Sequence, residues 1–413
     1  MRFLHLADLH LGKSVHSVSM IENRDQPVWT ERFLALADEL RPDAVVMAGD
    51  IYDRSAPSGD AVELLSYLLT ELSRRGICEM LIAGNHDSGQ RLAFAGELLS
   101  RSGVHIAGTL KDNALLEHVT LSDEYGPVTF WLMPYVFPAA VSRVLGEELR
   151  DYDSAVRKLL SVQPLDSSQR NVIVAHQNVT ANGVEAVRGG SETMVGGVGQ
   201  VDCSAFDAFE YAALGHIHSG YSVGRESVRY AGSPLCYHFE ETHQRAKGPV
   251  LVTLGPKESP PVLETQYIEP LHPMRELKGT FAALRDAELR DMRRGEYVRV
   301  ILTDCRVTPE ASAFFRDLYA GRDSVLMELT SEYRPFGGEA GAPSAGSARE
   351  KPVEELFADF YAERTGGETP SAEEEELLRF AGELSRHAEP GTKPGESEIA
   401  RLLDFALGQE EKR

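Results

Sequence analysis

The sequence predicts a protein of the α/β class, and two observations support this prediction. Short apolar runs bounded by glycine and turn residues alternate with stretches of helical periodicity over residues 1–255, and such runs are typical of buried strands. Five of these runs also end in clusters of metal-ligating residue types. Because ligands in layered α/β proteins collect outside the carboxyl ends of strands, we expect the five clusters to meet in one site.

The strands are expected, in chain order, at FLHLA, AVVMA, MLIA, NVIVA and YAAL. Helices are expected between the first three, at TERFLALADELR and GDAVELLSYLLTELSRRG. The polar clusters that follow the strands are Asp8-Leu9-His10, Gly49-Asp50-Ile51-Tyr52-Asp53, Gly84-Asn85-His86-Asp87, His176 and Gly215-His216-Ile217-His218. A glycine opens three of them, which lets the backbone turn or approach a site that a Cβ would obstruct.

The residue types define the kind of site. Asp8 and His10 are two apart, so on an extended backbone their side chains leave the same face, and His216 and His218 repeat this spacing. Carboxylate, amide and imidazole groups suit Mn²⁺, Fe²⁺ or Zn²⁺, and the clusters hold no thiolate that would favour a soft metal. Each cluster alone has a plainer explanation: GNHD could cap a helix, and His176 could be a core histidine.

The ordered set DxH, GDxxD, GNHD, H and GHxH resembles the calcineurin-like metallophosphoesterase superfamily. The segments MRFLHLADLHLGK and RYAGSPLCYHFEE narrow the resemblance to its SbcD-type nuclease family. The likeness covers most of residues 1–335 and is weaker beyond them. It implies a two-sheet β-sandwich flanked by helices, with a small α+β capping domain and C-terminal helices.

The resemblance also implies a role for each site residue. One metal would be held by Asp8, His10, Asp50 and His218, and a second by Asp50, Asn85, His176 and His216, with Asp50 bridging. Two divalent cations, expected to be Mn²⁺, would hold a hydroxide and clamp the attacking and leaving oxygens. His86 would stabilise the pentacovalent phosphorus or protonate the leaving oxygen. Asp53 would orient His86, although some relatives have histidine there, and Asp87 would fix the turn.

Breaks in the pattern suggest four segments. Residues 1–260 form the predicted nuclease domain, and 262–333, from VLETQYI to SVLMELT, form the capping domain. Residues 335–350 are rich in Gly, Ala, Pro and Ser and are expected to be a flexible linker. Residues 351–413 are expected to form amphipathic helices that bind a partner.

The apolar stripe of the first of these helices consists of Val353, Leu356, Phe357, Phe360 and Tyr361, at the spacing of one helix face. Short helices beyond a flexible linker are suited to docking in a groove. The resemblance names the receiver as the base of the coiled coil of an SbcC-type ATPase. The alternative is a small helical bundle with its own core.

Composition bears on the partners. The net charge is −22, of which residues 350–413 contribute −9, whereas a protein that binds DNA by its own surface usually has a basic footprint. We therefore expect weak DNA binding by the chain alone.

Four cysteines without a CxxC pair are expected to be reduced. The absence of a signal-peptide pattern or an apolar run long enough to span a membrane predicts a cytoplasmic protein.

Together these features predict a two-metal DNA phosphodiesterase. The resemblance implies 3′→5′ cleavage of duplex ends and endonucleolytic cleavage of single strands and hairpins, in DNA repair and recombination, by a homodimer within a heterotetramer with the ATPase. Two alternatives remain. A small-molecule phosphodiesterase or phosphatase of the same superfamily would explain the acidic surface but not the capping domain or the C-terminal helices. A non-catalytic assembly scaffold would not need the full ligand set.

Overall fold

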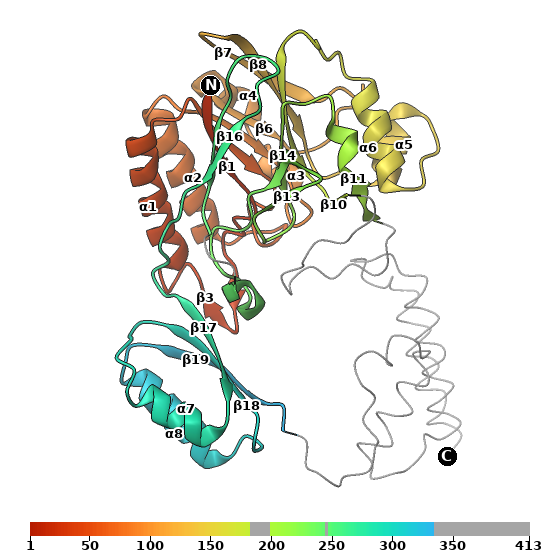
Figure 1. The fold of residues 1–413 in the computed structure, drawn as a ribbon. Coiled ribbons are helices and arrows are strands. Elements are labelled where there is room, and N and C mark those ends of the chain that lie inside the picture. The colour runs from red at the N-terminus through yellow and green to blue at the C-terminus, as the bar shows by residue number, and fades with distance from the viewer. Residues whose placement is uncertain (182–198, 244–246, 334–413) are drawn as a thin grey trace, which may run out of the picture. The chain divides into compact units, whose positions relative to one another are not determined.

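The structure, a computed structural model, describes residues 1–181, 199–243 and 247–333 (Figure 1). Residues 1–333 form one compact unit. The predicted linker and the predicted docking residues Val353, Leu356, Phe357, Phe360 and Tyr361 lie outside the described residues. None of the helices in the described ranges is long and apolar enough to cross a membrane. All four cysteines lie within the described residues and are free.

The first of two six-stranded sheets contains the three N-terminal predicted strands. Its order is β16 (Val262–Thr265), β15 (Val250–Thr253), β1 (Arg2–Leu6), β4 (Ala44–Ala48), β5 (Cys78–Ile82) and β6 (Val104–Ala107). Strands β1, β4, β5 and β6 are parallel, while β15 and β16 are antiparallel to their neighbours. The carboxyl ends of β1, β4 and β5 therefore lie along one edge of the sheet.

The second sheet repeats this plan with the other two predicted strands. Its order is β13 (Tyr221–Val223), β14 (Arg225–Tyr230), β12 (Tyr211–Gly215), β9 (Arg170–His176), β8 (Gly126–Met133) and β7 (Glu117–Asp123). The four central strands are parallel. Strand β9 ends at His176 and β12 ends at Gly215, so the second sheet also delivers ligand types at its strand ends.

The two sheets pack face to face around an apolar core, in which the ring of Phe3 lies edge-on to those of Phe130 and Tyr211. Helices α1 (Asp25–Leu40) and α2 (Gly59–Arg74) cover the outer face of the first sheet. Helices α5 (Pro138–Leu145) and α6 (Tyr152–Ser161) cover the second. This is the helix-flanked β-sandwich that was predicted, and α2 begins where the Ser58 hydroxyl accepts from Ala61 N.

Shorter elements complete this part of the chain. They are β2 (Ser14–Val15), β3 (Val18–Ser19), α3 (Gly89–Leu92), α4 (Gly96–Leu99), η1 (Ser100–Ser102), β10 (Val179–Thr180), β11 (Val201–Asp202), η3 (Cys203–Phe206) and η4 (Phe239–His243). The η4 turn follows the YAGSP segment and bears on the site described below.

Residues 274–331 form a three-stranded parallel sheet of β17 (Met274–Gly279), β18 (Tyr297–Leu302) and β19 (Val325–Ser331), with helices α7 (Phe281–Glu288) and α8 (Pro309–Ala320). Phe315 and its neighbours give it a core of its own. One assignment was wrong: the strand in VLETQYI does not belong to this sheet, because Val262–Thr265 pairs with β15. The apolar pattern of VLETQYI fits a strand in either sheet, so periodicity could not show which of the two sheets the strand joins.

Candidate metal centre

The first ligand pair lies just beyond β1, and its backbone is not extended as the spacing argument assumed. Asp8 and His10 have φ values of 52° and 43°, in the left-handed region. This conformation is unfavourable for L-residues, but hydrogen bonds to the neighbouring loop stabilise it here. Asp8 N donates to Gly49 O at 3.1 Å and His10 N donates to Asp50 O at 2.9 Å. The side chains of Asp8 and His10 lie close together because the loop after β4 stabilises this turn. The alternation of side chains along an extended strand, which the sequence argument used, is not the reason.

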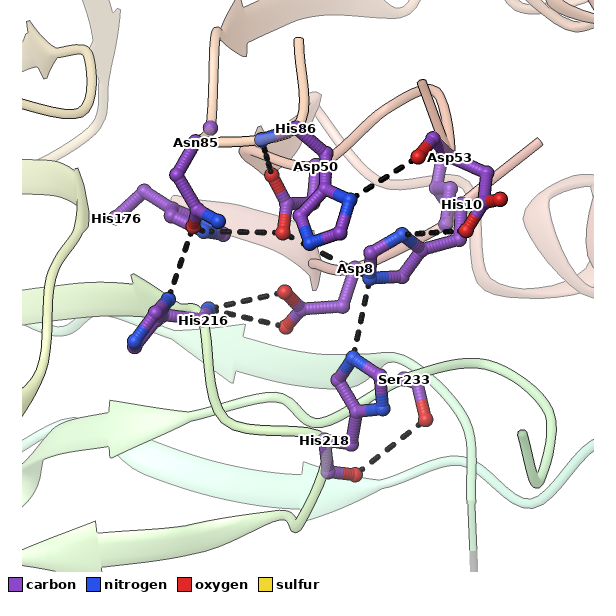
Figure 2. A network of polar contacts seen from close by, with 12 residues as sticks. Asp8, His10, Asp50, Asp53, Asn85, His86, His176, His216, His218 and Ser233 are labelled. Carbon is purple, nitrogen blue, oxygen red and sulfur yellow. Dashed lines mark hydrogen bonds and ion pairs between the residues drawn. The ribbon is translucent and has the colours of Figure 1, made fainter. Parts of the chain in front are cut away.

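Asp50 lies at the centre of the cluster (Figure 2). Its Oδ1 accepts from His86 N at 2.9 Å, while Oδ2 lies 3.3 Å from His176 Nε2 and 3.7 Å from His10 Nε2. Gly49, immediately before it, has a φ of +84°, and a Cβ there would collide with the His176 ring. The glycine is therefore required both for the turn and for the approach of the two sheets.

Two sets of donor atoms surround Asp50. In the first, Nε2 of His10 and Nε2 of His218 face each other at 3.1 Å, and Asp8 contributes the third ligand atom within 4.8 Å. Imidazole nitrogens that converge on a carboxylate in this way are suited to a shared divalent cation. Asp8 also accepts from His216 N, at 3.0 and 3.2 Å to its two oxygens.

The second set lies on the other side of Asp50. Asn85 Oδ1 is 3.0 Å from His176 Nε2 and 3.0 Å from His216 Nδ1 (Figure 2). Asp8, Asp50 and His176 also place ligand atoms within 4.8 Å of one another. The seven predicted ligands are thus brought together from the ends of five strands in two sheets, with Asp50 between the two sets.

Metal ligands must be deprotonated, and the pKa shifts of the predicted ligands favour this state only in part. Burial would lower the pKa of His176, but the charge and hydrogen bond of Asp50 raise it to about 9. Burial, and then the charge of His176, lowers the pKa of His216 to about 3, and burial lowers the pKa of His10. Both rings are therefore neutral at pH 7. Burial would raise the pKa of Asp50, but the charge and hydrogen bond of His176 lower it below its usual range.

The structure corrects the expected partner of His86. The exposed His86 ring donates through Nδ1 to the main-chain oxygen of Asp53 at 3.0 Å, and not to its carboxylate. That carboxylate instead accepts from Lys13 Nζ at 2.8 Å and lies 3.5 Å from His10 Nδ1. Lys13 therefore contacts the carboxylate that was expected to contact His86. His86 is also close enough to His10 and Asp50 for the three to form a third possible metal group.

Asp87 has the role that was predicted for it. Its carboxylate accepts from Gly84 N at 2.9 Å, Ile51 N at 3.0 Å and Tyr52 N at 2.8 Å. It therefore joins the GNHD loop to the loop that follows β4. Burial raises the pKa of Asp87 to about 6, although these three donors oppose the shift.

Other residues at the site had no recognisable signal in the sequence. Gln26, buried at the start of α1, accepts from Gly12 N at 2.9 Å and donates to His10 O at 2.8 Å and Tyr237 OH at 3.1 Å. Tyr237 OH donates in turn to Leu9 O at 2.6 Å. Gln26 and Tyr237 thus stabilise the turn that carries Asp8 and His10 through hydrogen bonds to its main chain. Tyr237 stands in the YAGSPLCYHFEE segment, whose family likeness gave no sign of this contact.

Known proteins match this chain over both parts of the fold. The family model described as calcineurin-like phosphoesterase matches residues 1–220, and the one described as type 5 capsule protein repressor C-terminal domain matches residues 270–365. The D subunit of the nuclease SbcCD from Staphylococcus saprophyticus is 30% identical over 284 residues, which cover 67% of this chain and 71% of that protein. The protein of the same name from Staphylococcus epidermidis is 30% identical over 285 residues, with the same coverage.

Solved structures give a weaker likeness. The protein TT1561 of Thermus thermophilus aligns with 45% of this chain and 71% of its own at 14% identity, with a TM-score of 0.27. By contrast, the family model covers more than half of the chain, and the two relatives are 30% identical over 67% of it. The chain belongs to the calcineurin-like phosphoesterase family, in the group of the SbcCD D subunits, and is a metal-dependent phosphodiester hydrolase.

Proposed function

We propose that this protein is a two-metal DNA nuclease that works with an SbcC-type ATPase. The observation that carries the proposal is the convergence of two donor sets on Asp50, each with carboxylate and imidazole atoms within 4.8 Å. A pair of divalent ions sharing one carboxylate is suited to in-line displacement at phosphorus. The relatives are named as D subunits of the nuclease SbcCD, and these names support DNA as the substrate and the ATPase as the partner.

The ligand assignment follows the two donor sets. Asp8, His10, Asp50 and His218 would hold one ion, and Asp50, Asn85, His176 and His216 the other. Bound there, the ions would supply a water-derived nucleophile near neutral pH and neutralise charge on the phosphate. Oxygen and nitrogen ligands without a thiolate fit Mn²⁺, which we propose as the working ion.

His86 would act on the phosphoryl group. Its Nδ1 is engaged by Asp53 O at 3.0 Å, which leaves Nε2 to face the side of Asp50 and His10. A protonated Nε2 could donate to a phosphate oxygen or to the leaving oxygen. Because His86 is exposed, a substrate can reach it without a rearrangement of the core.

We further propose 3′→5′ cleavage of duplex ends and endonucleolytic cleavage of single strands and hairpins, in DNA repair and recombination. The net charge of −22 supports a division of labour in which the ATPase supplies much of the grip on DNA. In this proposal two copies of the chain assemble with the ATPase into a heterotetramer, and the predicted helices of 351–413 dock on it.

The test compares the full chain with an Asp50→Ala variant in Mn²⁺. We expect the wild type to cut a hairpin DNA, and we expect Asp50→Ala to lose bound metal and cleavage together while its circular dichroism spectrum is unchanged. Asp112→Ala, at an exposed position, is the matched control and should behave as wild type. Normal cleavage by Asp50→Ala would contradict the binuclear assignment. Hydrolysis of bis-p-nitrophenyl phosphate without cleavage of any DNA would favour a small-molecule phosphodiesterase.

A further inference from the structure

The outer side of the His218 ring meets a buried carboxylate. Glu241, in the η4 turn, is 0% exposed, and its Oε1 lies 3.1 Å from His218 Nδ1. The opposite nitrogen, Nε2, is the one that faces His10 at 3.1 Å. His218 is therefore held between the candidate metal position on one side and Glu241 on the other.

Glu241 is itself fixed by several donors. Its Oε2 pairs with Lys247 Nζ at 2.8 Å and accepts from Tyr237 N at 3.2 Å and Ser233 Oγ at 3.3 Å. Lys247 Nζ also donates to His218 O at 2.8 Å. One buried ion pair thus holds both the ring and the main chain of the same histidine.

A buried ion pair is an expensive way to build a core, because two charges lose their hydration. Its presence beside a predicted metal ligand therefore suggests that the ion pair positions this ligand. A carboxylate that accepts from one ring nitrogen makes that nitrogen the protonated one and leaves a lone pair on the other. Such partners orient metal-bound histidines, and their loss commonly weakens metal affinity about 10–100-fold.

The other histidines of the site are held differently. His176 Nδ1 donates to a main-chain oxygen, Ala48 O, at 2.8 Å. His10 Nδ1 lies 3.5 Å from the Asp53 carboxylate, which is already engaged by Lys13. Asp53 and Glu241 are each paired with a lysine, but the carboxylate lies closer to Nδ1 in His218 than in His10.

We infer that Glu241, held in place by Lys247, is a positioning residue that fixes the tautomer and the ring orientation of His218 for metal binding. This inference rests on the proposed function, in which His218 is a ligand. It assigns a task to the HFEE part of the segment that follows the last ligand motif. Because the Glu241 side chain is fully buried, it does not touch substrate and acts only through His218.

A double-mutant cycle tests the inference, with Mn²⁺ affinity measured by isothermal titration calorimetry on the full chain. We expect Glu241→Gln to weaken Mn²⁺ binding about 10–100-fold, and we expect this effect to vanish in a His218→Ala background. Glu240→Gln, at the exposed neighbouring residue, is the matched control and should bind Mn²⁺ as wild type does. A second variant, Glu241→Leu with Lys247→Met, removes both buried charges and should show the same loss, even if the single variant unfolds.

The outcomes separate the inference from the proposal beneath it. If His218→Ala weakens binding but neither Glu241 variant does, the positioning role is wrong. The role is also wrong if the Glu241 effect persists in the His218→Ala background, since the loss would then be structural. If His218→Ala itself binds Mn²⁺ normally, the ligand assignment of the proposed function fails instead.

Discussion

Glu79, a buried residue outside the candidate metal centre, leads to a prediction about how the stability of the protein depends on pH. It lies on β5, pairs in register with Val45 and Val104, and is 0% exposed. Within the described part of the chain, neither carboxylate oxygen has a hydrogen-bond partner. Burial alone raises the pKa of Glu79 from 4.5 to about 9. The folded protein therefore holds this side chain as a neutral acid at pH 7.

The sign of the pH dependence follows from proton binding. The folded state binds this proton more tightly than the unfolded state, so the contribution to stability is fully present below pH 4.5 and is lost as the pH rises toward 9. The slope is about 1.4 kcal/mol per pH unit. Between pH 4.5 and 7 the free energy of unfolding should therefore fall by about 3.4 kcal/mol on account of Glu79 alone.

The perturbation is Glu79→Gln, which keeps the shape and removes the ionisation. We expect the two proteins to be nearly equal in stability at pH 4.5. From pH 5.5 to 8.5 the variant should gain about 4 kcal/mol relative to wild type. Urea denaturation followed by circular dichroism, in EDTA so that metal linkage is absent from both proteins, measures this difference.

The refuting result is a stability difference that is the same at pH 5.5 and 8.5. Such a result would mean that Glu79 is ionised in the folded protein, or that water reaches it. Glu63→Gln, at an exposed position on α2, is the matched control and should show no pH-dependent difference from wild type.

Three further predictions concern the site and the tail. His86→Gln should retain Mn²⁺ by calorimetry but cleave DNA about 10²–10³-fold more slowly, as expected for loss of one transition-state stabiliser; reduced metal binding would make His86 a ligand. Gln26→Leu should weaken Mn²⁺ binding, because it removes the hydrogen bond from Gln26 to the main chain of His10. The matched variant at another buried glutamine, Gln163→Leu, should lower stability and leave the Mn²⁺ affinity unchanged. Deletion of 351–413 should preserve metal-dependent cleavage by the isolated protein and abolish pull-down of the ATPase; an unfolded product would place these helices in the globular core.

The sequence by itself determined the strands, the residue types at their ends and the family. These features are local: an apolar run between turn residues buries itself wherever it lies, and parallel strands bring their ends to a common edge. Asp50 and His176 could therefore be assigned to one site although they lie on different sheets. The role of Asp87 was also predictable, because its donor Gly84 N is only three residues away.

The tertiary structure alone decided how the ligands are held. The left-handed backbone of Asp8 and His10 depends on the loop after β4, and the contact of His86 with Asp53 O depends on a competing lysine. Likewise, nothing near Glu241 in the sequence indicates that its carboxylate faces His218, 23 residues away. Such contacts join segments that are distant along the chain, and local periodicity carries no information about which polar groups will meet once the sheets have packed.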